Sequence, residues 1–119
     1  MSIINLTQHM ATAEQVTAGV VEPPDRNAVI RLLTFDICPD RDEIRRRSEA
    51  LAKIARDSGA KTALVGGAPY LMGPLEAALR EADIQPLYAF SQRVAVEETQ
   101  NDGSVRKVQV FRHAGWIWA

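Results

Sequence analysis

This 119-residue sequence contains one cysteine, few aromatic residues and nearly equal numbers of acidic and basic residues. Its single cysteine, Cys38, excludes an internal disulfide framework and is typical of a reducing compartment. The 14 basic and 15 acidic residues give a net charge of -1. Without an overall positive field, we expect no duplex DNA partner, and any nucleic-acid contact would need a local patch.

Long apolar runs and metal-ligand clusters are also lacking. No hydrophobic run approaches the roughly 20 residues of a membrane span. The residues after Met1 do not combine a basic region with an apolar stretch, as a signal peptide would. We therefore expect a cytoplasmic protein with no membrane partner. Two distant histidines and no cysteine pair match no usual metal-ligand spacing, so we expect neither a metal nor another cofactor.

The hydrophobic fraction of 46% and charged fraction of 24% are ordinary for a globular protein. A chain of this length can bury a core of its own, so residues 1–119 are predicted to form a single α/β domain.

The first half of the sequence predicts a strand and several helices. Residues 3–6 form a β-rich run, and Thr12 with Gln15 forms a capping box that opens a short helix. Residues 28–35 fit a helix or a strand equally, because their apolar positions do not decide the period. Asp40 caps the strongest helix, which ends before Gly59.

The second half alternates strands with one helix. Strands are predicted at 62–65 and 87–90, with a helix at 70–82 between them. Polar alternation follows from Ser91 to Glu98, and Asp102-Gly103 predicts a hairpin turn before a returning strand. Helical crossovers imply parallel strands. The predicted fold is therefore α/β and Rossmann-like, with a mostly parallel sheet flanked by helices and a C-terminal antiparallel β-hairpin.

Ligands of open α/β sheets bind outside the carboxyl ends of the parallel strands. Three predicted segments meet that condition, and they supply our candidate ligand-binding residues: Asn5, Thr7 and Gln8 with His9; Gly66 and Gly67; and Ser91, Gln92 and Arg93.

Each candidate also has a structural interpretation. The Gly66-Gly67 turn suits a phosphate at a helix N-terminus, or a tight turn that needs no side chain. His9 suits a general acid or base, or a cap of the next helix. Arg93 suits bidentate phosphate contacts, or a surface salt bridge to Glu97 or Glu98.

The C-terminal strand carries aromatic residues that suit an interface. Phe111, Trp116 and Trp118 are predicted to form a homodimer or partner surface, because aromatic side chains are enriched at interfaces. His113 lies in the same strand, where an interface or core-edge position is expected.

Parts of the sequence resemble the signature of a family of small proteins of bacteria, phages and mobile elements. The resemblance is carried by four stretches: Asn5 to His9, Tyr88 to Arg93, Asp102 to Lys107 and Val110 to Trp116. The resemblance covers nearly the whole chain, and the family generally lacks an assigned activity.

The layout is more distantly similar to the CRISPR-associated and viral anti-CRISPR ring nucleases. Ser91-Gln92-Arg93 at a strand end and the terminal Trp116-Ile117-Trp118 carry this similarity. It implies a homodimer that binds, and without metal cleaves, a cyclic oligoadenylate second messenger in phage defence or counter-defence. The viral family's catalytic histidine has no counterpart in residues 66–69, so His9 would take that role.

Two functions follow as expectations. The first is binding, and possible cleavage, of a cyclic oligoadenylate or a related nucleotide. The alternative is a non-catalytic homodimeric interaction protein that uses its aromatic C-terminal strand.

Overall fold

The computed structural model describes residues 2–119 and contains a five-stranded sheet in the order β2-β1-β3-β4-β5. Its strands are β1 (Ile3–Leu6), β2 (Val20–Val21), β3 (Thr62–Val65), β4 (Gln85–Thr99) and β5 (Val105–Trp118). The β1–β2, β1–β3 and β3–β4 pairs are parallel, and β4 and β5 are antiparallel. The predicted α/β class, the mostly parallel sheet and the C-terminal hairpin are confirmed.

The helices begin where the sequence supplies caps. They are α1 (Ala13–Thr17), α2 (Arg26–Leu33), α3 (Arg41–Asp57) and α4 (Pro69–Glu81). Thr12 and Gln15 form the predicted capping box, and the Asp40 side chain accepts from the Glu43 N–H at 2.7 Å. The ambiguous segment at 28–35 is mostly helical, because Asp25 caps α2.

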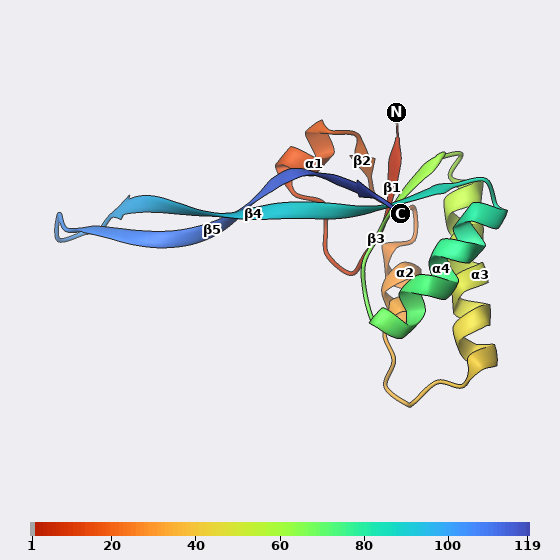
Figure 1. Ribbon diagram of the computed structural model, residues 1–119. Coiled ribbons are helices and arrows are strands. Elements are labelled where there is room, and N and C mark those ends of the chain that lie inside the picture. The colour runs from red at the N-terminus through yellow and green to blue at the C-terminus, as the bar shows by residue number, and fades with distance from the viewer. Residues whose placement is uncertain (1) are drawn as a thin grey trace.

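The sheet has two unequally covered faces. Helices α2, α3 and α4 cover one face, where Ile4, Leu6, Ala63 and Val65 join the main core. The short α1 lies on the other side (Figure 1). There Ile3, Val20, Leu64 and Leu87 form a smaller cluster, partly covered by Ala11, Ala89 and Trp116. Because β1 and β3 are buried on both faces, their residues are mostly apolar and show no alternation of polar and apolar positions.

Two features differ from the sequence-based expectation. Val20–Val21 forms a two-residue parallel edge strand that its local sequence did not predict. Strand β4 does not end at Ser91-Gln92-Arg93 but continues to Thr99, so these residues do not lie at a strand end. Polar alternation from Ser91 onward is the pattern of a strand with exposed faces, and it continues the hairpin rather than closing the strand.

Beyond Phe90 the β4–β5 hairpin leaves the helical body as a long arm, residues 91–113 (Figure 1). The register shifts between Phe90 and Ser91, which marks the irregularity at the base of this arm. The predicted turn at Asp102-Gly103 is confirmed at its tip, where Gly103 adopts a φ of 85°. Within the described residues, no helix is long and apolar enough to cross a membrane.

Candidate functional site

A cavity of about 420 Å³ lies at the carboxyl ends of β1 and β3. It combines the loop after β1, the start of α1, the turn after β3 and the beginning of β4. Its lining residues are Thr7, Gln8, His9, Met10, Thr12, Gln15, Leu64, Val65, Gly66, Gly67, Tyr88 and Ala89. Two of the three predicted segments therefore converge on one cavity.

Strand order explains why the cavity forms here. From β1 the chain passes to β2 on one side, whereas β3 lies on the other side of β1 and is followed by β4. The connections after β1 and β3 therefore diverge. This divergence is the topological switch point at which open α/β sheets bind ligands.

The loop after β1 is organised by a buried amide. Asn5 is fully buried, and its Nδ2 donates to the carbonyl oxygen of His9 at 2.8 Å. Its Oδ1 accepts from the Thr7 N–H at 3.0 Å and from the Thr7 hydroxyl at 2.7 Å. Asn5 itself is absent from the cavity lining. Its side chain shapes the loop that presents Thr7, Gln8 and His9.

A carboxylate that the sequence did not indicate holds this loop to β2. Glu22 follows Val21 and accepts from Asn5 Nδ2 at 2.9 Å and from the Ala11 N–H at 2.9 Å. Arg26 donates to Glu22 at 2.9 Å and to the Gln8 carbonyl oxygen at 2.6 Å. No local pattern reveals Glu22, because its partner Asn5 is 17 residues away.

The turn after β3 contributes backbone to the cavity. Gly67 adopts a φ of 156°, and a Cβ there would lie 3.4 Å from Met72 Cε. A Cβ on Gly66 would lie 3.5 Å from Thr7 Cγ2, where the β1 and β3 loops meet. Helix α4 then begins with Ala68 as its N-cap. Because alanine has no polar side chain, no side-chain oxygen caps the first N–H groups of this helix.

Tyr88 forms part of the β4 side of the cavity and is tied to α4. Its hydroxyl donates to Glu76 Oε2 at 2.7 Å. Burial, and then the hydrogen bond and charge of Glu76, raise the pKa of Tyr88 from 10.0 to about 12. The phenol is neutral at physiological pH and bonded away from the cavity.

The cavity lining contains neutral side chains and His9, but no Lys, Arg, Asp or Glu. The nearby Arg26 is engaged by Glu22 and the Gln8 carbonyl. The lining therefore suits polar, uncharged groups and a few backbone contacts. A strongly anionic ligand would need a cation from elsewhere.

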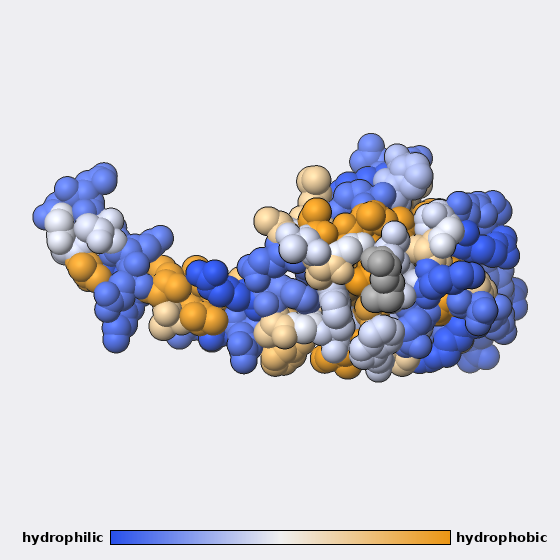
Figure 2. All heavy atoms as spheres, turned by 90° about the horizontal axis from the view of Figure 1, so that it is seen from above, coloured by the Kyte–Doolittle hydropathy of each residue, from blue (hydrophilic) through white to orange (hydrophobic). Residues whose placement is uncertain are grey.

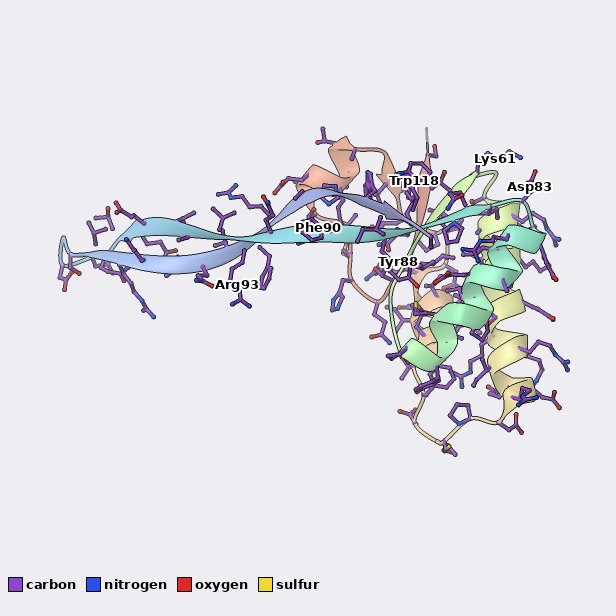
Figure 3. The ribbon with its side chains drawn as sticks, in the orientation of Figure 1. Lys61, Asp83, Tyr88, Phe90, Arg93 and Trp118 are labelled. Carbon is purple, nitrogen blue, oxygen red and sulfur yellow. The ribbon has the colours of Figure 1, made fainter. Side chains whose placement is uncertain are left out.

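The third predicted segment lies on the arm. Ser91, Gln92 and Arg93 are exposed and outside the cavity lining. The Arg93 guanidinium lies 5.4 Å from the Phe111 ring centroid, and Figure 3 shows it beyond the helical body. Arg93 follows Ala89 of the lining by four residues, about 13 Å along an extended strand.

The predicted interface residues differ in exposure. Phe111 is 69% exposed and Trp118 is 59% exposed, so both present aromatic surface. Trp116 is half-buried against the Ile3 cluster, and its ring centroid lies 4.4 Å from that of His113. Trp116 therefore contributes to packing inside the chain.

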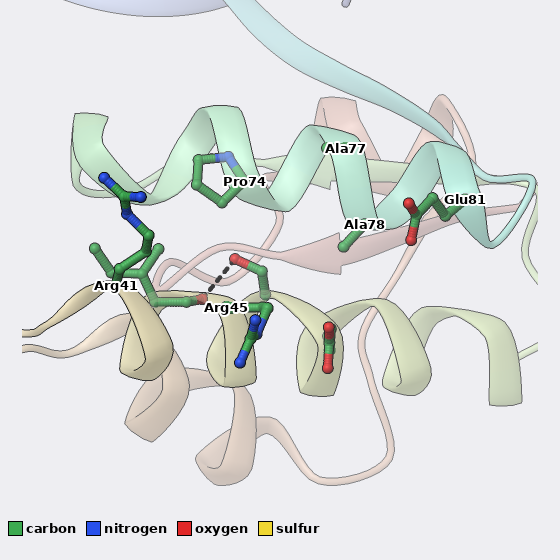
Figure 4. A pocket seen from close by; sticks show the side chains of 9 residues that line it. Arg41, Arg45, Pro74, Ala77, Ala78 and Glu81 are labelled. Carbon is green, nitrogen blue, oxygen red and sulfur yellow. Dashed lines mark hydrogen bonds between the residues drawn. The ribbon is translucent and has the colours of Figure 1, made fainter.

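A second cavity of about 290 Å³ lies between α3 and α4 (Figure 4). Small side chains, including Ala77 and Ala78, leave space between the helices, and Arg41 and Glu81 stand at its edge. Ser48 is its buried polar residue, and its hydroxyl donates to the Ile44 carbonyl at 2.8 Å. This cavity is far from the strand ends and offers no unpaired buried polar group.

The fold defines an α/β protein with a cavity at the topological switch point of its sheet. The chain belongs to the uncharacterized protein MJ1673 family, whose model matches residues 1–117. No curated protein and no solved structure gives a significant match to it.

The Glu22 network generates a stability prediction. Glu22→Ala removes the acceptor of the Ala11 N–H and one of the two acceptors of the buried Asn5 amide, so we expect the free energy of unfolding to fall by about 1–3 kcal/mol. Urea denaturation measures this change. The control is Glu49→Ala, an exposed glutamate, which should change stability by about 0.5 kcal/mol or less. Equal effects of the two substitutions would contradict the role of Glu22.

Tyr88 generates a pH prediction. Its raised pKa means that the neutral phenol is favoured in the fold. Its contribution to stability is complete below pH 10.0 and is lost as the pH rises through about 12. An ultraviolet phenolate titration should contain a step near 12 that Tyr88→Phe removes and Glu76→Gln moves to lower pH. A titration that is unchanged in Glu76→Gln would refute this assignment.

Proposed function

We propose that the switch-point cavity binds a nucleotide, with a cyclic oligoadenylate as the specific candidate. The observation that supports this proposal is the convergence of Thr7, Gln8, His9, Gly66 and Gly67 on one cavity at the β1/β3 switch point. The neutral polar lining would take a base and ribose, and the Gly66-Gly67 N–H groups would bind a phosphate oxygen.

Charge favours a ligand longer than one nucleotide. The lining holds no Arg or Lys, whereas Arg93 lies on β4 about 13 Å beyond Ala89. A ligand that fills the cavity and also meets Arg93 must extend along β4. An oligonucleotide has this reach, whereas a nucleoside monophosphate does not. Arg93 would then neutralise a phosphate that lies outside the cavity.

Cleavage would use His9, the histidine of the lining. Its imidazole would accept the proton of a ribose 2′-OH, whose oxygen attacks the adjacent phosphorus. The P–O5′ bond would break, the 5′ oxygen would take a proton, and a 2′,3′-cyclic phosphate would form. Because His9 is exposed and the Asn5 and Thr7 contacts hold its backbone, its ring remains available for this role.

Calorimetric titration with cyclic tetra- and hexa-adenylate tests the proposal, with product analysis alongside. Gly66→Val should weaken binding at least about tenfold, or ~1.4 kcal/mol, because its side chain grows beside Thr7 where the cavity lies. The control is Gly73→Ala, where an added Cβ meets nothing within 4 Å. His9→Ala should keep binding and lose cleavage. Absence of binding at micromolar protein would overturn the proposal.

The exposed aromatic residues favour a second candidate, a non-catalytic homodimeric interaction protein of a phage or mobile element. Phe111, Ile117 and Trp118 on β5 are each at least half exposed, and aromatic side chains are enriched at interfaces.

Light scattering of Phe111→Ser and Trp118→Ser tests this second candidate. Both variants should lower the molar mass toward that of one chain, because each removes apolar contact area. Val16→Ser is the control, since Val16 is 57% exposed on α1, away from the arm. An assembly that tolerates both β5 substitutions would show that the aromatic strand is not its contact.

A further inference from the structure

The arm leaves one edge of β4 without a partner strand. Strand β3 pairs with β4 only from Gln85 to Leu87, because β3 ends at Val65. From Tyr88 to Thr99, β4 pairs with β5 on one side, and no described strand lies on its other side. Backbone N–H and C=O groups along such an edge can pair with another strand.

The sequence along this edge is complementary to itself. Residues 93–97 read Arg-Val-Ala-Val-Glu. When two copies of this segment run antiparallel about a two-fold axis at Ala95, Arg93 of each lies opposite Glu97 of the other. Val94 of each then lies opposite Val96. Opposite charges and paired β-branched residues that face each other across strands are both stabilising.

Neither charge forms a salt bridge within residues 2–119, although Glu97 lies opposite Lys107 across the β4–β5 pair. Both Arg93 and Glu97 are exposed. The Arg93 guanidinium lies 5.4 Å from the centroid of the Phe111 ring. Both ends of the segment are therefore available to a second copy.

Charge also distinguishes the β4 edge from the β5 edge. The β5 sequence contains Arg106, Lys107 and Arg112 but no Asp or Glu. Two β5 edges placed together would face each other with positive side chains alone, while Glu97 and Glu98 lie on β4, opposite Lys107 and Arg106. The β4 edge carries both signs at the required spacing, so charge selects β4 for self-association.

Apolar side chains on one face of the arm fit the same arrangement. Val94 lies opposite Val110 and Val96 opposite Val108, and all four are only half-buried. Figure 2 shows hydrophobic residues gathered along this arm, outside the body. A lone two-stranded hairpin is marginally stable in water, whereas three or more strands with an apolar face are stable. Pairing two arms makes a four-stranded sheet with one continuous valine face.

We infer that two copies of this chain associate by antiparallel pairing of their β4 edges over Arg93–Glu97. This contact lies on β4 and is therefore different from the aromatic β5 contact of the second candidate function. It does not rest on the nucleotide proposal, because it requires no ligand.

Charge reversal tests the inference by light scattering and native mass spectrometry. The wild-type chain should be a dimer. Arg93→Glu alone and Glu97→Arg alone each place like charges opposite one another twice, and each should weaken the dimer at least tenfold. An equimolar mixture of the two variants restores both opposite-charge pairs and should give a mixed dimer. The doubly substituted chain, with Arg93→Glu and Glu97→Arg, should dimerise like the wild type.

The matched control is Arg112→Glu, which makes the same charge change on β5 and should leave the dimer intact. Restoration in the mixture excludes misfolding of the arm as the cause of dissociation. A wild-type monomer at high protein concentration would overturn the inference. So would single variants that dimerise normally, or a mixture that stays monomeric. None of these outcomes depends on nucleotide binding, so the test separates this contact from the cavity.

Discussion

The unequal lengths of neighbouring strands determine both the cavity and the arm. Strands β1 and β3 each have four residues, whereas β4 has 15 and pairs with β3 over only three. Where β3 stops, β4 continues and contributes Tyr88 and Ala89 to the cavity beside the diverging loops. The same continuation carries β4 past the helices that would cover it. The difference in length between β3 and β4 thus creates both the cavity at the end of the sheet and the solvent-exposed edge of β4 beyond it.

The shape of the cavity depends on contacts made behind its lining. Asn5 is buried in β1, and its amide is satisfied by Glu22, by Thr7 and by the His9 carbonyl. Glu22 follows β2 directly, so the two-residue pairing of β2 with β1 positions the carboxylate that holds the loop. A buried polar group left without its partner is costly. The loop carrying His9 is therefore held by groups that no ligand would touch.

The helix caps and the hairpin turn, which depend only on neighbouring residues, were predicted correctly from the sequence. Asp40, the Thr12–Gln15 box and Asp102-Gly103 each act within a few residues, and each lies where it was expected. Glu22 was missed because its role depends on a partner 17 residues away. The position of Arg93 was misjudged because polar alternation describes an exposed strand as well as its end. Nothing in residues 91–98 indicates that β3 ends at Val65 and pairs with β4 only from Gln85 to Leu87, because that limit is set by another segment of the chain.

The cavity and the arm divide the chemistry of the molecule between them. The lining contains no Lys, Arg, Asp or Glu, whereas the hairpin cations Arg93, Arg106, Lys107 and Arg112 lie on the arm. If Arg93 serves both a ligand phosphate and Glu97 of a second copy, the two uses compete for one guanidinium. Thermodynamic linkage then requires reciprocity: a ligand that draws Arg93 away weakens the dimer by the same factor by which the dimer weakens the ligand. A ligand that reached only the cavity would leave the arm contact unchanged. The reach of the ligand along β4 therefore decides whether the two parts of this chain act together.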